Sequence, residues 1–373
     1  MPLHLHWFLP AHGDGRTLSR RPDTGVRAAQ RSPDIGYLTQ VACAADQLGF
    51  AGLLLPAGLF CEDPWMLSAA LAARTERVKF MIAFRPGLLS PTLAAQMAAT
   101  GQRLTNGRLL LNVVTGGDPD EQRRYGDFLD HDQRYERADE FLAIVRAAWS
   151  GRAGDFSGRH YEVRGAVTMR PPAPPPTVFV GGSSEAARRV AVRHGDVYLA
   201  WGETPPLLGE LIAKVRTAAD AEGRRLAFGT RFHVISRDTA QQAWAEAGQL
   251  LAELDPAMVR AAQQRFARSE SEGQRRMAAL HAGQADRLEV YPNIWAGFGL
   301  LRPGAGAAIV GSHEEVAQRI AELHAAGVEH LILSGQPHLE EAYWFGEGVM
   351  PLLRERGLLD AVAGATTTPA ARP

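Results

Sequence analysis

Arginine and histidine alternate on one predicted strand of this 373-residue chain. Arg231 and His233 flank Phe232 within the apolar run 227–235, and alternate residues of a strand point to the same face. A guanidinium is a fixed cation that binds anions, and an imidazole can transfer protons near neutral pH. The pair predicts an anion site beside a proton-handling group. The alternative is that Phe232 and Val234 face the interior and that Arg231 forms an ordinary ion pair.

A second anion site is predicted where Gly181-Gly182-Ser183-Ser184 leads into a helix that begins near Glu185. The free amides at a helix N-terminus and two hydroxyl groups favour a phosphate. The alternative is a glycine turn followed by a serine N-cap, which many helices have.

The elements that must position these residues alternate along the chain. Short apolar runs predict eight buried parallel strands, at 5–9, 52–55, 79–84, 109–114, 177–180, 197–200, 227–235 and 330–333. Helical periodicity predicts helices between them, including 35–48, 93–104, 134–149, 185–193, 206–222 and 312–325. This count predicts a (β/α)8 TIM barrel in the α/β class, with a doubly wound sheet as the alternative.

In such a barrel the active site lies at the carboxyl ends of the strands. That rule selects further candidates from the strand ends, namely His12, Cys61, Arg85, Asn112, Thr115, Trp201 and Gln336. Cys61 has two interpretations, a reactive thiol or a side chain that lines the site.

We expect one domain over residues 1–359, with insertions at about 13–34, 151–176 and 255–306, and a flexible tail at 360–373. Long insertions in compact domains build lids, substrate walls or subunit contacts, although each could also be a surface element that only packs.

Composition excludes several classes of protein. The chain has 40 basic and 41 acidic residues, a net charge of −1, which argues against nucleic-acid or anionic-membrane binding. No signal peptide or apolar span is visible, so we expect a cytoplasmic protein. His4 and His6 lie at the beginning of a strand and lack further ligands on later strand ends, so no metal site is predicted. Neither a dinucleotide-binding glycine motif nor a Walker loop is present.

Several ordered motifs together resemble the bacterial luciferase-like flavin monooxygenases, and most closely the two-component alkanesulfonate monooxygenases. The motifs are Trp7-Phe8-Leu9-Pro10-Ala11-His12-Gly13-Asp14-Gly15, Cys61-Glu62-Asp63-Pro64-Trp65, Asn112-Val113-Val114-Thr115-Gly116, Gly181-Gly182-Ser183-Ser184 and Arg231-Phe232-His233-Val234. The resemblance covers about residues 3–355. It implies reduced FMN and O2 as co-substrates, a separate NAD(P)H-dependent FMN reductase, and cleavage of an organosulfonate to an aldehyde and sulfite. Relatives are commonly dimers or tetramers, so a homo-oligomer is expected.

The resemblance also implies roles for individual residues. Arg231 and Arg302 would hold the sulfonate or the peroxide, and His233 would assist proton transfer. Trp201, His12 and Cys61 would line the pocket. Ser183, Ser184 and Tyr135 would contact the FMN phosphate, with Asn112, Thr115 and Gly182 also at the cofactor.

One position departs from the resemblance. The alkanesulfonate enzymes carry Tyr in a Ser-Gly-Tyr-Pro-His run where this chain has Gln336, which cannot supply a proton. Gln336 and Arg85 are therefore interpreted as specificity residues that suit a hydroxylated substrate such as sulfoquinovose. Three alternatives stay open: another organosulfur or carbonyl substrate, a deazaflavin-dependent dehydrogenase, or a flavin-binding protein without catalysis.

Overall fold

The structure, a computed structural model, describes residues 2–18, 31–252, 254–282 and 287–360. The predicted insertion at 13–34 lies only partly within this range. The predicted tail, apart from Asp360, lies outside it.

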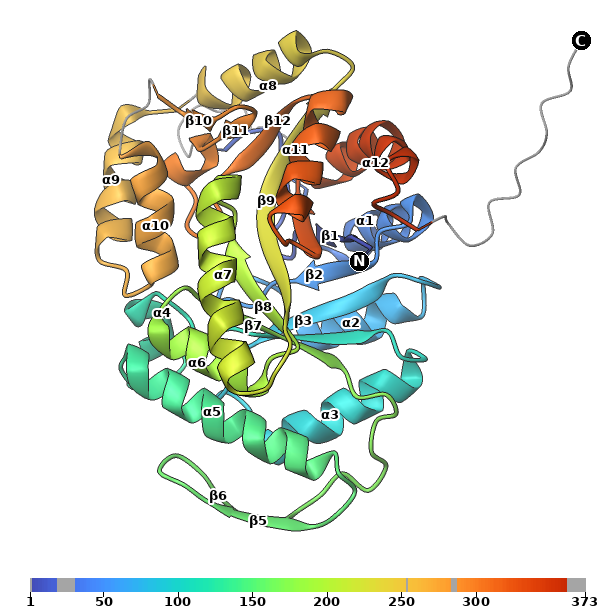
Figure 1. Ribbon diagram of the computed structural model, residues 1–373, viewed down its shortest axis with the longest axis vertical. Helices are drawn as coiled ribbons and strands as arrows, with labels where there is room; N and C mark the ends of the chain where they lie inside the picture. Colours follow the sequence, from blue (N-terminus) through green and yellow to red (C-terminus); the bar gives the residue numbers. More distant parts are fainter. Residues whose placement is uncertain (1, 19–30, 253, 283–286, 361–373) are drawn as a thin grey trace, which may run out of the picture.

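Eight parallel strands close into a barrel, in the order β1-β2-β3-β4-β7-β8-β9-β13, and β13 pairs with β1 (Figure 1). The fold is a (β/α)8 TIM barrel, so the predicted fold class is confirmed. The strands are β1 (His4–Phe8), β2 (Gly52–Leu55), β3 (Lys79–Phe84), β4 (Leu109–Val113), β7 (Thr177–Gly181), β8 (Val197–Trp201), β9 (Ala227–Arg237) and β13 (His330–Ser334).

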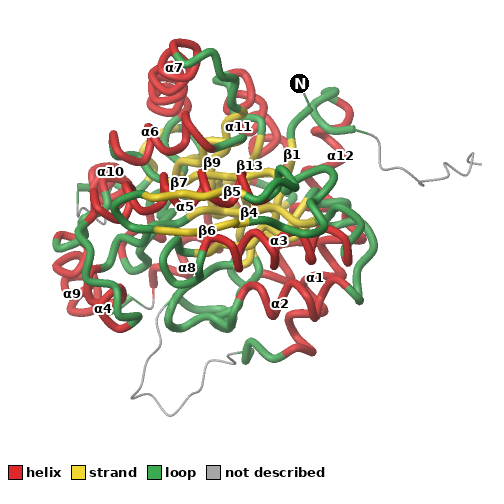
Figure 2. Tube along the Cα trace, turned by 90° about the horizontal axis from the view of Figure 1, so that it is seen from below, coloured by secondary structure: helices red, strands yellow, loops and turns green. Residues whose placement is uncertain are grey.

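Helices surround the barrel because each carries an apolar stripe that packs onto the sheet (Figures 1 and 2). They are α1 (Ile35–Leu48), α2 (Pro64–Ala72), α3 (Pro91–Leu104), α5 (His131–Ala148), α6 (Glu185–His194), α7 (Pro205–Ala221), α11 (His313–Ala325) and α12 (His338–Glu355). The six predicted helices are all present, with ends that shift by at most three residues.

Alternate residues of the strands fill the barrel interior. Phe8, Leu54, Ala83 and Leu199 belong to one apolar cluster inside it. His4, His6 and His330 stack at the amino ends of the strands, where the His6 Nε2 to His330 Nδ1 distance is 3.1 Å. This end is opposite to the end that carries the candidate site.

Two of the predicted insertions contain helices or strands that are not part of the barrel. Residues 151–176 contain an antiparallel hairpin, β5 (Gly154–Ser157) and β6 (Glu162–Ala166), which lies against α5. Residues 255–306 contain α9 (Pro256–Ala267), α10 (Glu272–His281), β10 (Glu289–Tyr291), β11 (Ile294–Trp295) and the 3-10 helix η1 (Gly297–Leu300).

The remaining elements are α4 (Pro119–Arg124), α8 (Ala240–Ala252) and β12 (Ala308–Ser312). Strand β12 was not among the predicted strands, and it extends the sheet outside the barrel by pairing with the carboxyl half of β9.

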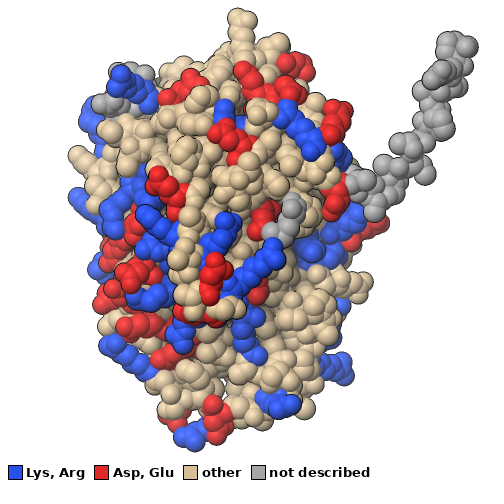
Figure 3. All heavy atoms as spheres, in the orientation of Figure 1, with Lys and Arg blue, Asp and Glu red and all other residues tan. Residues whose placement is uncertain are grey.

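Acidic and basic side chains are interspersed on the face in Figure 3, as the near-zero net charge would suggest. None of the described helices is long and apolar enough to cross a membrane.

Candidate active site

The interior face of β9 carries Arg231, and its guanidinium carbon lies 4.2 Å from the centre of the Phe8 ring. Phe232 and Val234 point the other way, into the layer under the helices. The predicted alternation is therefore confirmed, and the alternative in which Phe232 and Val234 face the interior is wrong.

Arg302 joins Arg231 at the mouth of the barrel, brought there by the insertion that contains η1. Its guanidinium carbon lies 5.6 Å from the centre of the Phe298 ring, and its Nη2 donates to Gln336 Oε1 at 2.6 Å. Each arginine keeps some exposure because it lines the opening, yet burial lowers the pKa of both to about 10, and the charge of Arg302 adds to the lowering at Arg231. Both remain cationic at neutral pH.

Among the described residues neither arginine forms an ion pair with a carboxylate, although the charge of Asp14 partly offsets the lowering of the Arg302 pKa. Two adjacent cations in a partly dehydrated place repel one another and lose hydration, which is costly without a counter-charge. The pair therefore forms a site suited to an anion.

His233 lies in the same mouth but is held within the protein. Its Nε2 is 3.1 Å from the Ala305 carbonyl oxygen, which can only accept, so Nε2 carries the proton. Its Nδ1 then accepts from the Ser334 hydroxyl at 2.9 Å, and its ring stacks on Phe298 at 3.9 Å. Burial, with the charges of Arg231 and Arg302, lowers the pKa of His233 well below its usual value. The ring is neutral.

His12, Cys61 and Trp201 surround the arginines. Burial, His338 and both arginines lower the pKa of His12 to about 4. Burial and Glu121 raise the pKa of Cys61 to about 11, so Cys61 is a neutral thiol, as expected for a lining residue. The Trp201 ring lies against α10 and the loop that carries Arg302, since a Cβ on Gly273 would lie 3.0 Å from it and one on Gly304 3.8 Å.

The second predicted anion site has a tightly fitted backbone. Gly182 has φ +130°, and a Cβ there would lie 2.4 Å from the Tyr135 hydroxyl, so no other residue fits. The Tyr135 hydroxyl donates to the Gly181 carbonyl oxygen at 3.4 Å. Burial raises the pKa of Tyr135, against the lowering effect of the Thr115 and Ser184 hydroxyls, so it stays protonated. Ser183 is buried beside them.

Ser184 is also the N-cap of α6, accepting from the Ala187 amide at 3.2 Å, so the capping interpretation is confirmed. The cap satisfies only one amide of the first turn. The other free amides of that turn remain available to bind an anion. The Arg188 guanidinium donates to the Ser183 carbonyl at 2.6 Å and adds positive charge, while the charges of Arg134 and Glu272 act in opposite directions on the pKa of Tyr135.

Two further candidates lie at the carboxyl ends of β3 and β4. Asn112 is buried on β4, and its Oδ1 has no partner among the described residues. Arg85 is also buried; its Nη2 donates to Glu121 at 2.7 Å, and its Nε and Nη1 have no such partner.

Gln336 follows β13 and is 4% exposed. Its amide already has protein partners at both ends: Arg302 at the oxygen, and the carbonyl oxygens of Gly15 and Thr17 (3.2 Å to Thr17) at the nitrogen. A cavity of about 210 Å³ lies beside it, lined by His12, Asp14, Arg302 and neighbouring residues.

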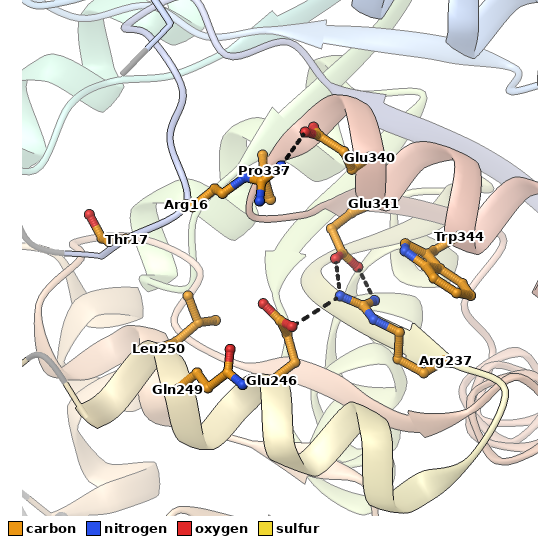
Figure 4. A pocket seen from close by; sticks show the side chains of 10 residues that line it. All are labelled: Arg16, Thr17, Arg237, Glu246, Gln249, Leu250, Pro337, Glu340, Glu341 and Trp344. Carbon is orange, nitrogen blue, oxygen red and sulfur yellow. Dashed lines mark hydrogen bonds and ion pairs between the residues drawn. The ribbon is translucent and has the colours of Figure 1, made fainter. Parts of the chain in front are cut away.

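A larger cavity of about 410 Å³ lies on the other side of Thr17, between α8 and α12 (Figure 4). There Glu341 accepts two hydrogen bonds from Arg237, at 2.9 and 2.6 Å, and Glu246 lies 3.7 Å from the same guanidinium. Burial raises the pKa of Glu341 to about 7. Arg237, Glu246 and Glu341 therefore already pair with one another in this cavity.

The structure thus brings Arg231, Arg302, His233, His12 and Cys61 together, and gathers Tyr135, Thr115, Gly182 and Ser184 at a second place. Sequence reasoning missed Arg188, although it lies one helical turn after Ser184, where a side chain can return to the N-terminus. It also missed Phe298 and Gln274, which sit in the insertion and had no periodic signal. Gln274 Oε1 accepts from the Gly304 amide at 2.9 Å.

Comparison with known proteins agrees with this architecture. The family model described as luciferase-like monooxygenase matches residues 3–330. A riboflavin lyase (RcaE), solved with modified FMN and riboflavin, has 22% identity and a TM-score of 0.81, over 96% of this chain and 93% of its own.

Two monooxygenases are also similar in structure. The EDTA monooxygenase EmoA from Chelativorans sp. BNC1 has 21% identity and a TM-score of 0.76, over 96% of this chain and 95% of its own. The long-chain alkane monooxygenase LadA has 22% identity and a TM-score of 0.75, over 97% and 93%. At these identities the structural likeness shows the fold alone. The family match spans most of the chain, and the chain belongs to the luciferase-like monooxygenase family.

Proposed function

We propose that this protein is a reduced-FMN- and O2-dependent monooxygenase that cleaves the C–S bond of an organosulfonate. The observation that carries the proposal is the pair Arg231 and Arg302, two adjacent cations that form no ion pair with a carboxylate among the described residues. A sulfonate stays ionised at all relevant pH values, so it needs fixed positive charge rather than an acid–base pair.

The cofactor site fits FMN by the chemistry of its donors. Gly182, Ser183, Ser184, Thr115 and Tyr135 would hold the phosphate, with Arg188 as the nearby cation. The unpartnered Oδ1 of Asn112 would accept a hydrogen bond from the flavin ring. The similarity to RcaE, solved with modified FMN, supports this choice. Reduced FMN, when bound, supplies the two electrons that the reaction needs.

The overall reaction balances as sulfonate, O2 and reduced FMN giving aldehyde, hydrogensulfite, oxidised FMN and water. Arg231 and Arg302 would orient the sulfonate and stabilise the negative charge that leaves with sulfite. Trp201, His12 and Cys61 would line the pocket and exclude water. His233 would assist proton transfer through the Ser334 hydroxyl bonded to its Nδ1.

We propose that reduced flavin comes from a separate NAD(P)H-dependent FMN reductase, as the resemblance to the two-component flavin monooxygenases implies. We propose a homo-oligomer, a dimer or a tetramer, as is common among the proteins that it resembles.

The test is sulfite release from reduced FMN and the protein in air, with a linear alkanesulfonate and with sulfoquinovose. Release from the alkane alone identifies an alkanesulfonate enzyme. Release from the sugar alone makes Arg85, at the mouth, a residue for the sugar hydroxyls. If neither compound releases sulfite while the protein still binds FMN, the proposal is contradicted, and another organosulfur or carbonyl substrate is favoured. Substrate-dependent reduction of oxidised deazaflavin in the absence of O2 would instead indicate a dehydrogenase.

A further inference from the structure

Gln336 occupies the junction of three chain segments, and its hydrogen bonds fix which way its amide points. A guanidinium only donates and a backbone carbonyl only accepts, so the Gln336 oxygen must face Arg302 and its nitrogen must face Gly15 and Thr17. Both N–H donors of the amide are therefore in use inside the protein, and its oxygen already accepts from Arg302.

We infer that Gln336 is a positioning residue that holds Arg302 for the anion and ties the loop after β1 to the same place. The inference rests on the proposed function for the identity of that anion. It gives Gln336 a different role from direct contact with a substrate hydroxyl, because both of its N–H donors are already used by backbone carbonyls and its oxygen is already bonded to Arg302.

A neutral acceptor is the suitable partner for Arg302. The Gln336 oxygen restrains the guanidinium at 2.6 Å without cancelling its charge, which remains available to a sulfonate. A carboxylate in the same place would form an ion pair with Arg302 and would also point at two carbonyl oxygens, which repel it.

Other contacts in the two loops support the same geometry. Asp14 accepts from the His338 amide at 2.7 Å and lies 3.0 Å from His338 Nδ1, so the loop after β1 is bonded to the start of α12 next to Gln336. The Arg302 loop is restrained on its other side by the bond from the Gly304 amide to Gln274. Gln336 is the group that links the two loops to each other.

The test compares Gln336→Glu and Gln336→Met with matched changes at Gln263. Gln263 lies in the same insertion, and its Nε2 also donates to two carbonyl oxygens, those of Gly299 and Leu300 at 3.0 and 2.9 Å. These two bonds do not involve the Arg302 guanidinium, so Gln263→Glu and Gln263→Met control for lost carbonyl bonds and for added charge.

Sulfonate affinity is measured by titration calorimetry with a linear alkanesulfonate, at pH 8 and at pH 5.5. We expect Gln336→Glu to lose at least about tenfold in affinity at pH 8, the size typical for a charged hydrogen bond, and to recover part of it at pH 5.5 as the carboxyl takes up a proton. Gln336→Met should lose affinity without pH recovery, and both Gln263 variants should bind as wild type does. A merely structural role would not produce the pH recovery.

Hydrogen exchange supplies a readout that does not depend on the substrate. In Gln336→Met, amides of residues 14–18 and 302–306 should both exchange faster, whereas Gln263→Met should leave residues 14–18 unchanged. If both segments of Gln336→Met exchanged at the same rate as in wild type, the inference would be overturned, even if the protein binds sulfonates. The remaining outcome is that the wild type binds no sulfonate while both segments still exchange faster in Gln336→Met. That result would overturn the proposed function and would support the linking role of Gln336.

Discussion

At the scale of single residues, the candidate cofactor site depends on Gly182. Its φ of +130° and the 2.4 Å approach of the Tyr135 hydroxyl leave no room for a side chain. Gly182→Ala should therefore displace Tyr135 and weaken FMN binding by about tenfold or more, since several phosphate contacts change together. Tyr135→Phe, which removes only the hydroxyl, should weaken it by roughly 3- to 10-fold. Quenching of flavin fluorescence measures both, and equal affinity in Gly182→Ala and wild type would contradict this site.

At the scale of elements, the N-terminus of α6 has a structural and a functional role that can be separated. Ser184→Ala removes the N-cap and should cost about 1 kcal/mol of unfolding free energy. Ser312→Ala removes the cap of α11, which accepts from the Glu315 amide in the same manner. Denaturant unfolding should show similar losses in both variants, while only Ser184→Ala weakens FMN binding. If Ser312→Ala weakened FMN equally, the effect would come from general loss of stability.

A second prediction at this scale concerns how α10 supports the mouth. Arg276 on α10 donates to the Glu203 carboxylate after β8 at 2.6 Å through both Nε and Nη2. Arg276→Met leaves the largely buried Glu203 without its cation and should release α10 from the barrel. Because α10 also holds the Arg302 loop through Gln274, KM for the sulfonate should rise several-fold. Arg189→Met, which breaks an exposed pair with Glu185, is the control and should leave KM unchanged.

At the scale of the whole molecule, the histidines at the amino end of the barrel make stability depend on pH. Burial lowers the pKa of His330 to about 3, and that of His6 well below its usual value. A histidine with a lowered pKa binds fewer protons folded than unfolded, so its stabilising contribution is present above about pH 6.5 and is lost as pH falls towards 3.

His330→Gln should reduce this acid sensitivity. Between pH 7 and pH 4 the unfolding free energy of this variant should fall by about 3 kcal/mol less than that of wild type, because it lacks one group whose pKa is lowered on folding. His131→Gln is the control, because His131 bonds Asp132 at the surface. An identical pH profile for His330→Gln and wild type would show that the cluster does not titrate on unfolding.

The barrel itself could be predicted from sequence because each strand is a continuous apolar run between helical periods, a local signal. Arg231 and His233 could also be placed in the site from sequence, because their alternation with Phe232 on one strand is likewise a local signal. The contact between Arg302 and Gln336 could not be predicted, because it joins a loop in an insertion to a strand end and no period relates them. Strand β12 was missed because 308–312 is short and directly precedes a helix, so its run merged with the end of the insertion.

The central claim is that Arg231 and Arg302 form the substrate's anion site. It is tested most directly by comparing, by calorimetry, the affinity of the protein for an alkanesulfonate and for the alcohol of the same chain length. We expect the sulfonate to bind at least about tenfold more tightly in wild type, and the difference to disappear in Arg231→Gln. Equal affinities for the sulfonate and the alcohol in wild type would contradict the account.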